Sequence, residues 1–92
     1  MIDVNGTVLA LSGPVTIATH ASLRSAAASH IGQGDWTIDW ANVTEVDSSA
    51  LSLIFAWQRA SLETNKTIRN LNLPSNLQSL AELYGVADLI PS

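Results

Sequence analysis

The chain has 92 residues and a formal net charge of −4, from 4 basic and 8 acidic side chains. That length is enough for one domain, and an acidic chain with so few cations is a poor candidate for binding nucleic acid. The absence of cysteine excludes disulfides and thiolate metal sites. Only 13% of the residues are charged, about half the usual share, so we expect part of the surface to be apolar and covered by another molecule.

The first third of the chain predicts a hairpin followed by a helix. Asn5-Gly6 lies between two apolar runs and is a turn signal for a β-hairpin. The second of these runs, Thr7 to Leu11, carries apolar residues on both faces, which is typical of an inner strand. Residues Thr16 to His30 predict a helix. Its expected buried line is Ile17, Leu23, Ala27 and Ile31.

The rest of the chain alternates between strands and helices. The predicted elements are a strand at Trp36 to Trp40, a helix at Ser48 to Glu63 and a strand at Lys66 to Leu73. A last helix begins at Ser75, which forms a predicted capping box with Gln78, and ends before Gly85. The order β-β-α-β-α-β-α predicts an α/β fold in a single domain over residues 1–92. We expect a mixed sheet of about four strands covered by about three main helices.

The helix at Ser48 to Glu63 has apolar residues on two sides. One stripe, formed by Leu51, Ile54, Phe55, Gln58 and Leu62, is suited to cover the sheet. The other side carries Leu53, Ala56, Trp57 and Ala60. Such a helix is either buried twice within its own domain or docked on another molecule. We expect docking, with Trp57 as an aromatic anchor. The alternative is that the last helix lies over Leu53 and Trp57.

The start of this helix, Asp47-Ser48-Ser49, has two interpretations. Asp47 is a good N-cap, and plain capping explains the spacing. The free N–H groups and the positive end of the helix dipole also favour an anion or a phosphate group.

Other chemistry finds no support in the spacing of residues. His20 and His30 lie ten positions apart on a predicted helix and predict no shared metal site. The only glycine-rich stretch, Gly32-Gln33-Gly34, is too short for a phosphate loop and lacks the following lysine. We therefore predict no catalytic residues, no metal and no cofactor, and read the chain as non-catalytic.

Three segments together resemble the STAS domain family. They are Val8-Leu9-Ala10-Leu11-Ser12-Gly13, Trp36-Thr37-Ile38-Asp39-Trp40-Ala41-Asn42-Val43 and Val46-Asp47-Ser48-Ser49-Ala50-Leu51. The family pattern is a strand ending in Ser-Gly, a strand ending in Asp-Leu-Ser, and Val-Asp-Ser-Ser-Gly-Leu opening a helix. Trp40-Ala41 and Ala50 depart from it. The resemblance covers essentially the whole chain and implies a STAS fold.

One branch of the family that the chain resembles is the MlaB-type subunits of phospholipid-transport ABC complexes, which support outer-membrane lipid asymmetry. This resemblance implies a cytoplasmic protein that binds an ABC ATPase subunit and is peripheral to the inner membrane through that partner, without direct membrane insertion. The expected partner-binding residues are Asp47, Ser48, Ser49, Ser52, Leu53, Ala56 and Trp57.

The second branch is the anti-sigma-factor antagonists, in which a partner kinase phosphorylates a serine of Asp-Ser-Ser-Gly. Ser49 matches that serine, and Ser48 is the neighbouring candidate. This branch implies a phosphorylation switch and an anti-sigma kinase as the partner.

Overall fold

A computed structural model gives the structure of the chain and describes residues 1–91. The predicted order of strands and helices is confirmed, and a short 3-10 turn, η1, follows the last helix. The elements are β1 (Ile2–Asn5), β2 (Val8–Val15), α1 (His20–Ala27), β3 (Trp36–Val46), α2 (Ser49–Leu62), β4 (Ile68–Leu71), α3 (Ser75–Leu83) and η1 (Ala87–Leu89).

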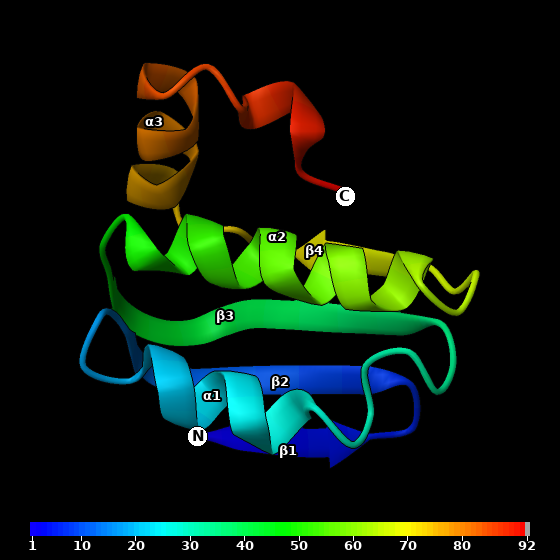
Figure 1. Cartoon of the computed structure of the whole chain (residues 1–92). Coiled ribbons are helices and arrows are strands. Elements are labelled where there is room, and N and C mark those ends of the chain that lie inside the picture. The colour runs from blue at the N-terminus through cyan, green and yellow to red at the C-terminus, as the bar shows by residue number, and fades with distance from the viewer. Residues whose placement is uncertain (92) are drawn as a thin grey trace.

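The four strands form one mixed sheet in the order β1-β2-β3-β4. β1 and β2 pair antiparallel, whereas β2–β3 and β3–β4 pair parallel. The first hairpin closes between Asn5 and Val8, with Gly6 at a φ of +59°, a backbone conformation that glycine adopts without steric cost. Helices α1 and α2 lie over the same face of this sheet, and α3 stands beside the β4 edge (Figure 1). The predicted α/β class is confirmed.

The core lies between that face of the sheet and the helices. Alternate residues of the two inner strands, such as Leu9 and Leu11 in β2 and Ile38 and Trp40 in β3, are at most 1% exposed. This period of two is the pattern that predicted the strands. Each buried side chain of this size contributes on the order of 1.5–3 kcal/mol of hydrophobic stabilisation.

Helix α1 is shorter than the sequence predicts. The Thr19 hydroxyl accepts the N–H of Thr16 at 3.0 Å and donates to the carbonyl of Pro14 at 2.9 Å. These bonds hold the segment before His20 in a turn. As a result Ile17 lies outside the helix and is 78% exposed, so its predicted place in the core is wrong, while the other three residues of that line are buried.

Helix α3 begins and ends at the predicted residues, but its first turn is held differently. The predicted capping box does not form, because Ser75 is already helical and makes no capping bond. The Gln78 side-chain amide instead donates to the Leu73 carbonyl at 3.0 Å. At the other end Gly85 takes a φ of +70° and terminates the helix, as expected for a glycine at that position.

The C-terminal segment is fastened to the edge of β4 by one asparagine. The Asn70 backbone N–H and side-chain amide both donate to the Pro91 carbonyl at 3.0 Å. The Asn70 side-chain oxygen accepts the indole N–H of Trp40 at 3.0 Å. Asn70 is only 7% exposed, and a side chain buried to this extent needs partners for its polar groups. These hydrogen bonds supply them within the chain.

Helix α2 occupies the middle of the helical layer and packs against both α1 and α3. Leu53, Ala56 and Trp57 are 0%, 8% and 3% exposed. The prediction that these three residues form an outward docking side is therefore wrong. The second apolar side of α2 is covered inside the domain, which is the alternative that the sequence left open.

Candidate functional site

The surface that α2 does expose is narrow. Its buried residues span well over half of the helix circumference at ~100° per residue, because neighbours cover it on three sides. Ser52, Arg59 and Leu62 are exposed, and Phe55 is half-buried. Leu62 is 63% exposed, so the stripe predicted to cover the sheet does so only in part.

The N-terminal end of α2 is organised by Asp47. One oxygen of its carboxylate accepts the backbone N–H of Ser49 at 2.9 Å and also the Ser49 hydroxyl. The other oxygen accepts the backbone N–H of Ile17 at 2.9 Å. Regular helix begins at Ser49, one residue later than predicted, so the N-cap position falls on Ser48, whose side chain makes no capping bond. The Asp47 carboxylate supports the first turn from one residue earlier, through the Ser49 N–H.

These bonds fix the charge of the site. The Ser49 hydroxyl, followed by the Ile17 N–H, holds the pKa of Asp47 below its usual range, and the nearby His20 adds a smaller effect in the same direction. Asp47 is therefore an ionised carboxylate at neutral pH. It already occupies the positive end of the α2 dipole, which weakens the case for a bound anion there.

His20 lies beside this carboxylate at the start of α1. Its Nε2 atom is buried and has no hydrogen-bond partner among residues 1–91. The side chain as a whole is partly buried.

An open depression of about 420 Å³ lies at this helix start, lined by Ile17, Asp47, Ser48, Ser49 and Ser52. Ser48 and Ser52 are exposed, and Ser49 is half-buried. The structure thus brings together the four polar residues that the sequence singled out. It separates them from Leu53, Ala56 and Trp57, which lie in the interior.

Ile17 is the residue of this surface that sequence reasoning missed. A signal was present, because Thr16-Ile17-Ala18-Thr19 is rich in β-branched residues, which are poor helix formers. Ala50, where the family pattern has glycine, is fully buried. That departure therefore changes the core and leaves the surface of the depression unaltered.

Nearly the whole chain also matches a family of known proteins. A family model described as "Mlab, STAS domain" covers residues 2–91. The chain belongs to this Mlab STAS family. Among curated proteins, none matches the chain.

Solved structures show that this Mlab STAS chain shares its fold with anti-sigma factor antagonists. The structure of the antagonist SpoIIAA in its unphosphorylated form has a TM-score of 0.69 and 15% identity, with 90% of this chain and 81% of that chain covered. The Bacillus cell fate determinant SpoIIAA in its phosphorylated form has a TM-score of 0.72 and 14% identity, with 98% and 86% covered. Within residues 1–91, no helix is long and apolar enough to cross a bilayer.

Proposed function

We propose that this chain is the STAS subunit of a phospholipid-transporting ABC complex, and that it binds and regulates or stabilises the ATPase subunit. The family match over residues 2–91 carries this proposal. The chain then acts as a binding module without chemistry of its own, as STAS domains generally do. Its place is the cytoplasm, peripheral to the inner membrane through the partner, in support of outer-membrane lipid asymmetry.

The docking surface in this proposal is the depression at the start of α2. Ile17 is 78% exposed at its border, and an exposed aliphatic side chain beside polar groups is a suitable interface anchor. Asp47, Ser48, Ser49 and Ser52 supply the polar groups around it. Leu53, Ala56 and Trp57 are withdrawn from the contact set, because a partner cannot reach them without unfolding the domain.

Regulation in this proposal follows from a difference in affinity. A bound subunit shifts the ATPase toward its assembled, active population only if it binds that state more tightly than the other. The proposal therefore predicts that ATPase activity rises with the concentration of this chain and saturates with binding.

Co-purification with the ATPase subunit from the same organism tests the surface. Ile17→Ala and Ser52→Glu leave the fold intact because both positions are exposed, and each is expected to weaken binding about tenfold, or ~1.4 kcal/mol. Ser25→Glu, at an exposed position of α1, is the matched control for added charge and should bind as wild type does. Wild-type binding by both α2-site variants, or no binding by the unmodified chain, overturns the proposal.

A second candidate function is an anti-sigma-factor antagonist switched at Ser49 or Ser48. The Ser49 hydroxyl at the helix start, bonded to Asp47, favours it. A phosphate on Ser49 stands beside the Asp47 carboxylate, so repulsion breaks the cap and releases the Ile17 N–H. Intact-mass measurement of the protein from its own cells separates the two: stoichiometric phosphate together with an anti-sigma kinase partner supports the switch, and its absence supports the transport subunit.

A further inference from the structure

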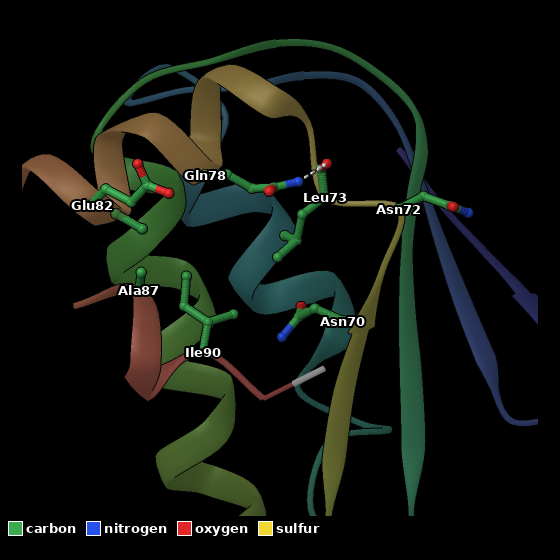
Figure 2. Close-up of a pocket in the computed structure, with 8 residues that line it drawn as sticks. Asn70, Asn72, Leu73, Gln78, Glu82, Ala87 and Ile90 are labelled. Atoms are coloured by element: carbon green, nitrogen blue, oxygen red, sulfur yellow. Dashed lines mark hydrogen bonds between the residues drawn. The ribbon is translucent and has the colours of Figure 1, made fainter. Parts of the chain in front are cut away.

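A second cavity lies on another part of the molecule, between β4, α3 and η1. Its volume is about 410 Å³, and it shares no lining residue with the depression at the start of α2. Its apolar wall is formed by Leu73, Ala81, Ala87 and Ile90, and its polar residues are Asn70, Asn72, Gln78 and Glu82 (Figure 2). We call it the α3 groove.

Each side-chain amide nitrogen of the α3 groove gives one of its two N–H groups to another part of the chain. The Gln78 amide nitrogen donates to Leu73, and the Asn70 amide nitrogen donates to Pro91. Asn72 points away from the other labelled side chains and donates to Asp39 (Figure 2). The side-chain oxygen of Gln78 and the carboxylate of Glu82 are acceptors without a partner among residues 1–91, and Glu82 is the one charged residue of the lining.

Gln78 and Glu82 are neighbours on one face of α3, one helical turn apart. Both are exposed at the rim, and Figure 2 shows them along the α3 wall of the groove. Residues 70–91 contain Glu82 and Asp88 but no lysine, arginine or histidine. The C-terminal part of the chain thus has a net negative charge, with no cation of its own to neutralise the groove.

Three large apolar side chains at the end of α3 and in η1 are exposed. Leu83 and Tyr84 at the end of α3 are 76% and 57% exposed, and Leu89 in η1 is 60% exposed. Exposed apolar side chains of this size supply contact area for a partner, and tyrosine is enriched in protein interfaces. The acidic charge argues against a membrane, because anionic lipid headgroups repel it.

We propose that the α3 groove binds a lysine or arginine side chain, presented by an apolar-flanked segment of a partner protein. The aliphatic stem of that side chain lies against Leu73 and Ile90, as long basic side chains do on apolar surface. Its cationic head reaches the Glu82 carboxylate and the Gln78 oxygen, which are acceptors without a donor of their own. The apolar residues that flank the cation cover Leu89, which is next in sequence to the groove-lining Ile90. This inference stands independently of the ATPase proposal.

Peptide binding followed by NMR of the 15N-labelled chain tests the groove. The probe is acetyl-Leu-Ala-Lys-Ala-Leu-amide, and two control peptides carry norleucine or glutamate in place of the lysine. We expect saturable shifts of the Gln78 side-chain amide and of the backbone amides of α3 and η1 with the lysine peptide. The norleucine peptide should bind about threefold more weakly, or ~0.7 kcal/mol, which is within the range for one partly exposed charge pair, and the glutamate peptide should bind more weakly still.

Glu82→Gln is expected to remove the preference for lysine over norleucine and to leave the fold unchanged, because the residue is exposed. Glu63→Gln, an exposed position after α2, makes the same chemical change elsewhere and should keep the preference. The proposal is overturned if no resonance of the α3 groove saturates at peptide concentrations up to about 10 mM. Such a result means that the binding free energy is weaker than ~3 kcal/mol. Equal binding of the lysine and norleucine peptides, or an unchanged preference in Glu82→Gln, also overturns it.

Discussion

Substitution of Asn70 by alanine is the sharpest test of how the sheet and the C-terminal segment are joined. Asn70 links three parts of the fold, since it accepts from the Trp40 indole and donates twice to the Pro91 carbonyl. Asn70→Ala keeps the backbone bond to Pro91 and removes both side-chain bonds. Trp40 is 1% exposed, so its indole N–H is left buried without an acceptor.

The expected loss of stability follows from these two bonds. A buried donor left without a partner costs about 1–3 kcal/mol, and the bond to Pro91 contributes about 1 kcal/mol. We therefore expect the free energy of unfolding to fall by about 2–4 kcal/mol, a large share of the ~5–15 kcal/mol that holds a domain folded. The melting temperature should fall by at least ~8 °C, since 1 kcal/mol shifts it by ~4–8 °C at this size.

Urea unfolding followed by circular dichroism and tryptophan fluorescence measures this loss. Arg69→Ala, the exposed neighbour on β4, is the matched control and should change the free energy of unfolding by no more than ~0.5 kcal/mol. If Asn70→Ala loses no more stability than Arg69→Ala, the side-chain hydrogen bonds of Asn70 do not hold the C-terminal segment in place.

Two further predictions concern the buried tryptophan of α2 and the carboxylate before it. In urea unfolding, Trp57→Phe should lower the free energy of unfolding by about 1–3 kcal/mol less than Trp40→Phe does. The Trp57 indole N–H has no partner among residues 1–91, whereas Trp40→Phe leaves the buried Asn70 oxygen without its donor. Equal losses in the two variants would contradict this. The lowered pKa of Asp47 means that its contribution to stability is present above its unfolded value of 3.8 and is lost as pH falls through the lower folded value. At neutral pH, wild type should be about 0.5–2 kcal/mol more stable than Asp47→Asn. In thermal melts this difference should shrink as the pH falls below 3.8. A difference that does not change with pH would show that the charge of Asp47 does not contribute to stability.

Local signals in the sequence predicted the elements of this fold well. Alternation identified β3, Asp47 marked the start of α2, and Gly85 marked the end of α3. Each of these signals depends on residues a few positions apart, so the chemistry that produces it is readable from the chain itself.

The orientation of α2 was the main error, and its cause is long-range packing. The pattern shows that α2 is apolar on two sides, but it does not show whether Leu53 and Trp57 meet a partner or another helix of the domain. That depends on how α1, α3 and β4 pack against α2, and these elements are far apart in the sequence. The α3 groove was invisible for the same reason, since its walls come from separate elements.

Asp47 ties the Ile17 backbone to the start of α2 before any other molecule arrives. A contact face that is assembled in the free protein loses little further conformational entropy when it is covered. Variants that alter only the groups touched by a partner should then change the lifetime of the complex, whereas loss of the Asp47 carboxylate should loosen the face itself and slow productive encounters.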